Sequence, residues 1–174
     1  YDRKGPKIFA GEYAAQSVAT VSPDNKNNWE CALAEAAFMT GLERNAEVVT
    51  MCSYAPLFAH SEGWQWTPDL IWFDNLKSYG TPNYYVQKLF SVNKGTQVLP
   101  MLLENAPLTG QQGVYGSAVQ DKNTKEVILK LANSSANAQV SNVELKGAGK
   151  INPMANMTVL KSQLLDGVNS LSNP

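Results

Sequence analysis

This 174-residue chain contains few residues of the types that most often hold metals or act as nucleophiles. Its two cysteines, Cys31 and Cys52, lie inside apolar segments without the paired spacing of a zinc site. We therefore expect small buried side chains, with a disulfide or a reactive thiol as the alternatives. His60 is the single histidine, and no nucleophile motif accompanies it, which disfavours a Ser-His-Asp or Cys-His centre. The sequence predicts neither a metal site nor any other cofactor.

Charge of one sign and long hydrophobic runs are also missing. The 14 lysines and arginines nearly balance 15 acidic residues, and no basic stripe is present that could neutralise a phosphate backbone. The longest apolar runs fall far short of the roughly 20 residues that a membrane-spanning helix needs. The first six residues do not have the pattern of a signal peptide. We therefore expect neither nucleic acid nor a membrane as a partner.

The front half of the chain alternates strand and helix signals, which is the pattern of a parallel βα architecture. An apolar run at 7–14 and a short β-branched run at 47–53 predict two buried parallel strands whose carboxyl ends share one edge. Between them, Asn27 and Asn28 offer a helix cap, and residues 32–44 are rich in helix formers. Together these signals predict a strand–helix–strand unit.

A long segment at 54–79 follows, and the pattern predicts no regular element within it. Irregular segments of this length in a compact domain are usually functional. Thr81 and Pro82 then predict the start of a second helix, and Asn93 predicts its end.

From Gln97 onward the hydrophobic pattern changes to a period of two, which predicts antiparallel strands packed as a β-sandwich. A hairpin loop is expected at 121–125. We place the boundary near Gly95, dividing the chain into domains 1–95 and 96–174. The candidate strands are 98–103, 114–120, 126–132, 139–145 and 157–160.

Glu12 is the candidate catalytic residue because it lies at the carboxyl end of the first predicted strand, where barrel enzymes keep their chemistry. Gly11 beside it leaves room for a ligand. The alternative is that Glu12 is a solvated acid or is paired with an arginine. In addition, the hydrolysis of glycosidic bonds normally needs a second carboxyl group. Glu35, Glu43 and Glu47 lie on the predicted helix and at its exit, where solvent contact or ion pairing is the expected role.

Four segments follow one another along the chain. The first is Ile8-Phe9-Ala10-Gly11-Glu12-Tyr13-Ala14, which precedes the alanine-rich helix, and the other three are 66–75, 79–87 and 127–133. In their residues and their order, these segments resemble the α-L-arabinofuranosidases of glycoside hydrolase family 51, and the resemblance covers nearly the whole chain.

The resemblance implies a retaining hydrolase with a (β/α)8 barrel followed by a jelly-roll-like β-sandwich. In it, the glutamate matching Glu12 ends the seventh strand as nucleophile, and the acid/base carboxyl group belongs to an Asn-Glu pair on strand four. No such strand is present here. We therefore expect a C-terminal fragment, truncated at both ends, that holds the last two βα units of the barrel and is inactive alone.

The implied substrate is an arabinose-containing polysaccharide or oligosaccharide, such as arabinan or arabinoxylan, from which terminal side chains are removed. Asn75, Trp72 and Trp66 are the substrate-binding candidates; hydration of the amide and packing of the indoles are the alternatives. Such an enzyme favours secretion or the periplasm, although action on imported oligosaccharides inside the cell stays open. The fragment is expected to self-associate through its exposed strand edges.

Two other functions remain open at this point. The strand-rich part could serve as a carbohydrate-binding or structural module, because sandwich folds host many functions. Another (β/α)8 retaining glycosidase, acting on xylosidic or galactosidic bonds, would use a strand-end glutamate in the same way.

Overall fold

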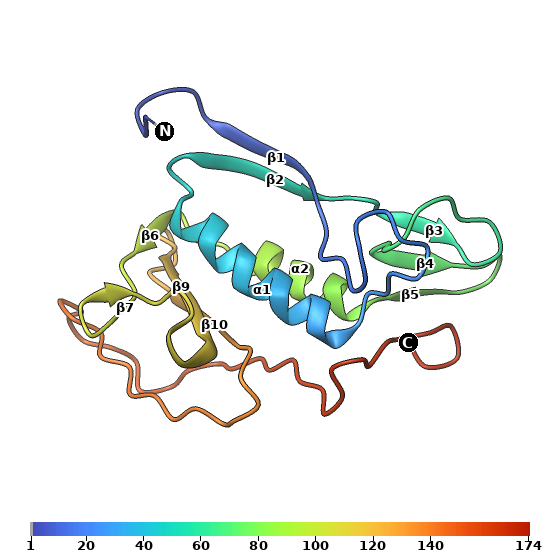
Figure 1. Cartoon of the computed structure of the whole chain (residues 1–174). Helices are drawn as coiled ribbons and strands as arrows, with labels where there is room; N and C mark the ends of the chain where they lie inside the picture. The colour runs from blue at the N-terminus through green and yellow to red at the C-terminus, as the bar shows by residue number, and fades with distance from the viewer. Residues whose placement is uncertain (1) are drawn as a thin grey trace.

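The computed structural model describes residues 2–174, and its front half is a parallel strand pair with two helices. Strands β1 (Ile8–Tyr13) and β2 (Val49–Tyr54) pair in parallel, and helices α1 (Trp29–Arg44) and α2 (Pro82–Val92) lie side by side (Figure 1). The predicted order of strands and helices is confirmed. Within residues 2–174 this pair is a two-stranded sheet, and no closed barrel is present.

Both helices begin and end at the polar residues that the sequence offers as caps. The Asn28 side chain accepts a hydrogen bond from the Cys31 N–H at 2.9 Å, so the predicted cap is confirmed and α1 begins at Trp29, ahead of the helix formers at 32–44. The Thr81 hydroxyl accepts from the Tyr84 N–H at 3.3 Å, and Pro82 occupies the first position of α2.

The two strands are more exposed than predicted. Phe9 and Met51 are each 57% exposed, although a buried parallel strand was expected at both places. The reason is that this sheet has two strands within the described chain and no further strand or helix packs closely over its outer face. Cys52 on β2 is likewise exposed, whereas Cys31 on α1 is buried as expected; both thiols are free. Burial raises the pKa of the Cys31 thiol to about 11, which keeps it protonated and unreactive at neutral pH.

Residues 54–79 were expected to be irregular, and this expectation is wrong. They contain β3 (Phe58–His60) and β4 (Ile71–Phe73) and lead into β5 (Ser78–Gly80). β3 pairs in parallel with β4, and β4 pairs antiparallel with β5. Strands of three residues are too short to show a period, and they are stabilised here by pairing with each other. In Figure 1 this sheet lies beyond the carboxyl ends of β1 and β2.

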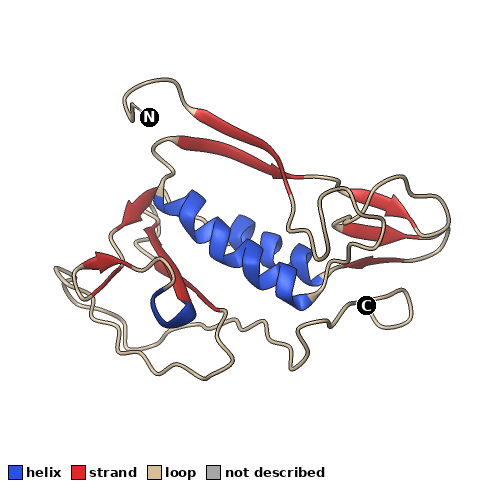
Figure 2. Cartoon of the chain, viewed as in Figure 1, coloured by secondary structure: helices blue, strands red, loops and turns tan. Residues whose placement is uncertain are grey.

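The second half forms a three-stranded antiparallel sheet of order β10-β9-β6, which also packs on α1 (Figure 2). The hairpin between β9 and β10 turns at residues 121–125 as predicted. The strand predicted at 98–103 is interrupted by Pro100, which has no N–H to donate. The elements are β6 (Gln97–Leu99), β7 (Leu102–Leu103), β8 (Ala106–Pro107), a 3-10 turn (Gln111–Gly113), β9 (Val114–Gln120) and β10 (Val127–Asn133).

The strands predicted at 139–145 and 157–160 do not form, so the expected sandwich is represented by three of its five predicted strands. These residues are almost all exposed and join no ladder of hydrogen bonds, which an apolar alternation alone cannot replace. The tail nevertheless serves α1: the carbonyls of Gly167 and Leu165 accept from the N–H groups of Trp29 and Glu30, both at 2.9 Å. These bonds satisfy donors that a helix start leaves free.

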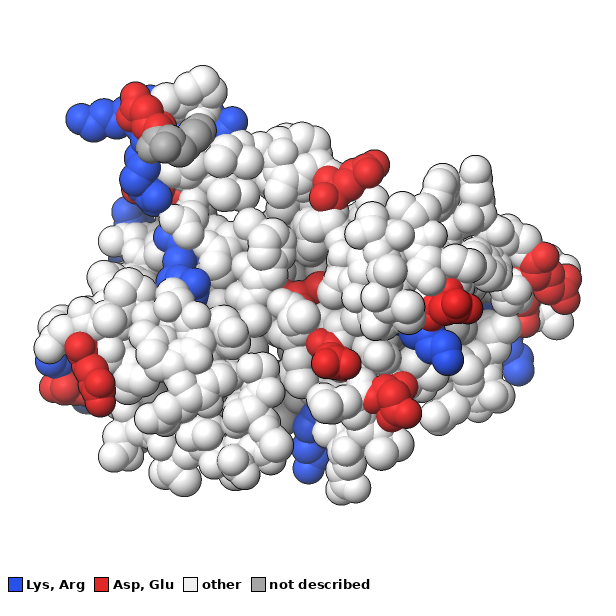
Figure 3. Space-filling view, in the orientation of Figure 1, with Lys and Arg blue, Asp and Glu red and all other residues white. Residues whose placement is uncertain are grey.

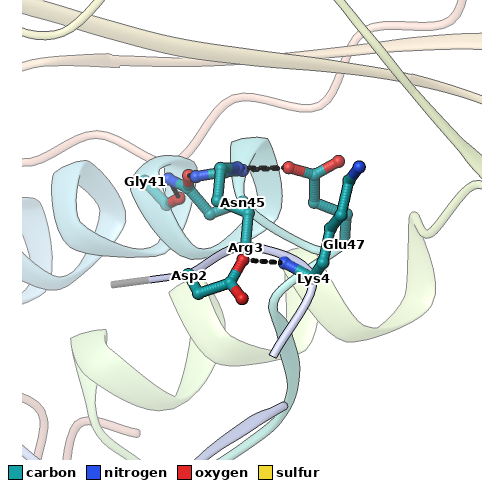
Figure 4. A network of polar contacts seen from close by, with 6 residues as sticks. All are labelled: Asp2, Arg3, Lys4, Gly41, Asn45 and Glu47. Carbon is teal, nitrogen blue, oxygen red and sulfur yellow. Dashed lines mark hydrogen bonds and ion pairs between the residues drawn. The ribbon is translucent and has the colours of Figure 1, made fainter. Parts of the chain in front are cut away.

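Two groups of polar contacts attach α1 to its surroundings near its carboxyl end. Arg3 donates to the Asn45 side chain at 3.1 Å and pairs with Glu47, which ties the N-terminal segment to the exit of the helix (Figure 4). Glu43 pairs with Lys130 on β10 and accepts from the Ser117 hydroxyl on β9 at 2.5 Å. The ion pairs expected for Glu43 and Glu47 are therefore present.

The hydrophobic core lies between the helices. It centres on Ala32, Met39 and Val86, with Phe90 and Leu160 packed against them. Because Leu160 belongs to the tail, the irregular C-terminal segment contributes to the core through single side chains.

Candidate active site

Glu12 lies near the carboxyl end of β1, at an irregularity in the sheet. Ala10 is opposite Cys52 and Tyr13 is opposite Tyr54, so β1 carries one residue more than β2 over this stretch. Such a bulge bends the strand and re-aims a side chain, and bulges are common beside active sites. Glu12 is exposed, and no hydrogen bond or ion pair within residues 2–174 reaches its carboxylate. The alternative of an arginine partner is therefore not realised in this structure.

Three hydrogen bonds hold the backbone around Glu12. The Ser53 hydroxyl donates to the Gly11 carbonyl at 2.5 Å. The Tyr13 hydroxyl donates to Gln87 Oε1 on α2 at 2.6 Å, and the Ala15 N–H donates to Glu35 Oε1 on α1 at 3.0 Å. The strand end is thus attached to β2 and to both helices.

Glu35 is 2% exposed, so the solvent contact or ion pair predicted for it is wrong. Its Oε2 accepts from Gln87 Nε2 at 3.1 Å, and its Oε1 accepts from the Ala15 N–H. Burial raises the pKa of this carboxyl group, and the hydrogen bonds from Ala15 and Gln87 oppose the rise only in part. A chain of polar contacts therefore runs from Glu35 through Gln87 to Tyr13, whose ring packs on Phe38 at 5.3 Å.

A second buried carboxyl group, that of Asp69, lies next to β4. Asp69 is 2% exposed, and its Oδ2 has no hydrogen-bond partner among the described residues. Burial raises its pKa to about 6. The charge of Asp69 acts on the nearby Tyr54, whose hydroxyl accepts from Asn27 Nδ2 at 2.7 Å. The protein interior at the carboxyl end of β2 therefore contains polar groups.

The buried carboxyl group of Asp69 predicts a pH-dependent stability. A pKa raised above the unfolded value of about 4 means that the folded state binds more protons between pH 4 and 6, so stability falls as pH rises through this window. The loss is on the order of 2 kcal/mol. In Asp69→Asn this contribution is absent, so the thermal midpoint of the variant should gain about 4–8 °C relative to wild type between pH 4 and pH 7. Thermal melts of both proteins at unit pH intervals measure this difference; a difference independent of pH would contradict the prediction.

The predicted substrate-binding residues lie on and around the β3–β4–β5 sheet. Trp72 on β4 stacks edge to face on Trp64, with ring centroids 6.1 Å apart. Asn75 follows β4, and its Oδ1 lies 3.4 Å from His60 Nε2. Trp66 is 51% exposed in the loop between β3 and β4. No hydrogen bond or ion pair within the described chain joins any of the three predicted residues to Glu12.

Asp74 in the same turn is structural. Its carboxylate accepts from the N–H groups of Leu76 and Lys77 at 2.7 and 2.6 Å, which closes the turn between β4 and β5 and lowers the pKa of Asp74. Its neighbour Asn75 makes no such turn contact, so its amide stays available beyond the bond to His60.

Two hollows adjoin these elements. The larger, about 600 Å³, lies beneath β2 against α2 and has mostly apolar walls, including Met51, Leu70 and Phe90. The smaller, about 210 Å³, is lined by Trp64, Trp72 and polar side chains including Asn27 and Asn169. Of the predicted binding residues, Trp72 contributes to a hollow, whereas Trp66 and Asn75 line neither of the two.

Residues 2–174 contain no group of three or more His, Cys, Asp or Glu side chains arranged to hold a metal ion. No helix in this range is both long and apolar enough to cross a membrane. Most of the face in Figure 3 is uncharged, with acidic residues scattered over it and basic residues both around the N-terminus and at separate places elsewhere.

The comparisons with known proteins identify the family. A family model described as "Alpha-L-arabinofuranosidase C-terminal domain" matches residues 11–174. The fold is that of a C-terminal domain rich in sheet with few helices, and the chain belongs to the α-L-arabinofuranosidase family as a C-terminal fragment of glycoside hydrolase family 51. The resemblance noted in the sequence is thus confirmed.

Individual relatives agree with this assignment. The chain is 50% identical over 119 residues to an extracellular exo-α-L-arabinofuranosidase of Streptomyces chartreusis, covering 66% of this chain and 13% of that protein. It is 37% identical over 178 residues to α-L-arabinofuranosidase 1 of Arabidopsis thaliana, covering 99% and 25%. The chain therefore spans a quarter or less of the length of these relatives.

Two solved structures share the fold. The arabinose-bound MgGH51 α-L-arabinofuranosidase superposes with a TM-score of 0.70 at 37% identity, covering 80% of this chain and 23% of that one. The GH51 arabinofuranosidase from Xanthomonas axonopodis pv. citri superposes with a TM-score of 0.59 at 20% identity, over 97% and 34%.

Proposed function

We propose that this chain is the C-terminal part of a retaining, exo-acting α-L-arabinofuranosidase in which Glu12 is the nucleophile. The observation that carries the proposal is an exposed, unpaired carboxylate at the bulged carboxyl end of a parallel strand, inside the region that the family model matches. A Cβ at Gly11 would meet only the Phe9 ring, at 3.6 Å, so the described chain does not itself require glycine there.

The chemistry would use two carboxyl groups. Glu12 would attack the anomeric carbon and form a glycosyl-enzyme, while a second carboxyl group about 5 Å away protonates the leaving oxygen and later activates water. Glu35 and Asp69 do not suit this second role, because both are 2% exposed. We assign the acid/base residue to a part of the protein outside this chain.

The remaining assignments belong to the same proposal. Residues 1–95 would be the last two βα units of a (β/α)8 barrel, and 96–174 would belong to the following β-sandwich. Terminal arabinofuranosyl groups of hemicellulose or pectin, as in arabinan and arabinoxylan, would be the substrates. Trp72 supports a role in substrate binding better than Trp66 or Asn75 does, because it lines a hollow together with Trp64.

An assay of two preparations tests this function. The full-length protein is expected to hydrolyse aryl α-L-arabinofuranosides, and residues 1–174 alone are expected to show no hydrolysis because the acid/base carboxyl group is missing. Aryl xylosides and galactosides serve as matched substrates in the same assay. Preferential hydrolysis of one of these would replace the arabinofuranosidase assignment, and hydrolysis by residues 1–174 alone would disprove the need for a second part. The free edges of β1 and β2 would favour self-association of the isolated chain, which its elution volume would reveal.

A further inference from the structure

The direction of the Glu12 side chain depends on its backbone, because no hydrogen bond or ion pair within the described chain holds the carboxylate. The backbone at this point is a bulge, and a bulge lacks part of the ladder that fixes a regular strand. The hydrogen bonds that hold Gly11, Tyr13 and Ala15 in place therefore also determine the position of Glu12. On the side of β2, the fixing group is the Ser53 hydroxyl on the Gly11 carbonyl.

On the side of the helices, the buried carboxyl group of Glu35 holds this backbone in place. Glu35 accepts from the Ala15 N–H with one oxygen and from Gln87 Nε2 with the other, at 3.0 and 3.1 Å. Gln87 passes the link on, since its Oε1 accepts from the Tyr13 hydroxyl at 2.6 Å. The bonds from Glu35 thus reach Tyr13 and Ala15, which follow Glu12 closely along the chain.

Helix packing alone gives no reason for a carboxyl group at this position. Glu35 lies on α1 between small residues, and the interior it enters is the contact between α1 and α2. Burying a carboxyl group there is costly, and an apolar side chain would pack without that cost. An apolar side chain would, however, leave the Ala15 N–H and the Gln87 amide without these partners.

We propose that Glu35 is a positioning residue that acts through Ala15, Gln87 and Tyr13 to hold Glu12 in its reactive direction. This inference rests on the nucleophile role proposed for Glu12. Glu35 itself touches neither substrate nor the reacting atoms. Its contribution is preorganisation, for which a displacement of about 1 Å can reduce the rate by about a hundredfold.

The hydrogen-bond pattern allows an exchange experiment in the full-length protein. In Glu35→Leu, the apolar side chain leaves both the Ala15 N–H and the Gln87 amide without these partners, whereas in Glu35→Gln the amide oxygen can accept from Ala15 and the NH₂ group can donate to Gln87 Oε1 once the Gln87 amide turns over. In the double variant Glu35→Gln/Gln87→Glu, the amide oxygen now at position 35 can accept from Ala15, and its NH₂ group can donate to the carboxylate now at position 87. That carboxylate can in turn accept from the Tyr13 hydroxyl. Every contact of the link is thereby restored with the two side chains exchanged.

We expect kcat of Glu35→Leu on an aryl arabinofuranoside to fall about tenfold or more with KM little changed, and Glu35→Gln and the double variant to stay within a few-fold of wild type. Glu43→Leu on the same helix is the matched control: it loses the ion pair to Lys130 and some thermal stability but keeps kcat. A kcat of Glu35→Leu within about twofold of wild type, or an equal loss in Glu35→Gln and in the double variant, overturns the proposal.

Two further measurements keep the result decisive. Tyr13→Phe cuts the same link at its other end while the ring remains, so it should also lower kcat, and an unchanged kcat overturns the proposal even where Glu35→Leu does not fold. Amide exchange across residues 13–17 is independent of activity. Faster exchange in Glu35→Leu, but not in Glu35→Gln or the double variant, supports the anchoring even if the protein hydrolyses no arabinofuranoside, an outcome that would remove only the proposed function. Unchanged exchange overturns the anchoring itself.

Discussion

Replacing Glu12 by glutamine in the full-length protein is expected to reduce hydrolysis of an aryl α-L-arabinofuranoside by at least about a thousandfold. The amide has nearly the shape of the carboxylate but carries no charge and cannot form the glycosyl ester on which the retaining mechanism depends. Because Glu12 is exposed and its carboxylate makes no hydrogen bond or ion pair within the described chain, the substitution removes no native polar interaction. The thermal midpoint should therefore stay close to that of the wild type, while kcat falls.

The control is the same chemical change at Glu126, an exposed carboxylate in the hairpin before β10. Glu126→Gln should hydrolyse the substrate at the wild-type rate. Mass spectrometry of the wild type after reaction with a slow, activated arabinofuranoside should find the sugar on the peptide that carries Glu12. Label on another carboxylate, or undiminished hydrolysis by Glu12→Gln, would remove Glu12 from the nucleophile role.

The features that could be predicted from the sequence are those set by neighbouring residues. Helix α2 begins where Thr81 supplies the cap and Pro82 the first position, and both signals lie in two adjacent residues. The β9–β10 hairpin likewise follows from alternating apolar residues around a polar turn. Glu12 could be selected because an acid directly follows an apolar run.

The features that could not be predicted depend on partners far along the chain. Glu35 contacts Ala15 at a separation of 20 residues and Gln87 at a separation of 52, so its burial left no local trace apart from an acid among alanines. The bulge at Glu12 is a relation between two strands, and a single apolar run contains no information on register. The alternation of apolar residues at 139–145 predicted a strand that does not form, because such a pattern gives a strand only where a neighbouring strand is available for pairing.

The contact between α1 and the antiparallel sheet predicts the largest effect on stability. Lys130 and Glu43 form an ion pair in which the side chains are 9% and 16% exposed, and the Lys130 ammonium also lies 5.3 Å from the centre of the Phe90 ring. Lys130→Met removes the positive charge and leaves a largely buried carboxylate whose only remaining partner within the described chain is the Ser117 hydroxyl. Breaking a buried pair in this way costs about 3–5 kcal/mol.

We therefore expect Lys130→Met to lower the thermal midpoint by about 6–20 °C. The double variant Glu43→Gln/Lys130→Met should recover most of this loss, because its neutral amide can still accept from Ser117 and no charge is left unpaired. Arg3→Met provides the exposed counterpart: Arg3 and Glu47 are 54% and 64% exposed, so losing their pair should cost less than about 1 kcal/mol. Equal losses in Lys130→Met and in the double variant would mean that packing of the lysine stem, and not the buried charge, stabilises this contact.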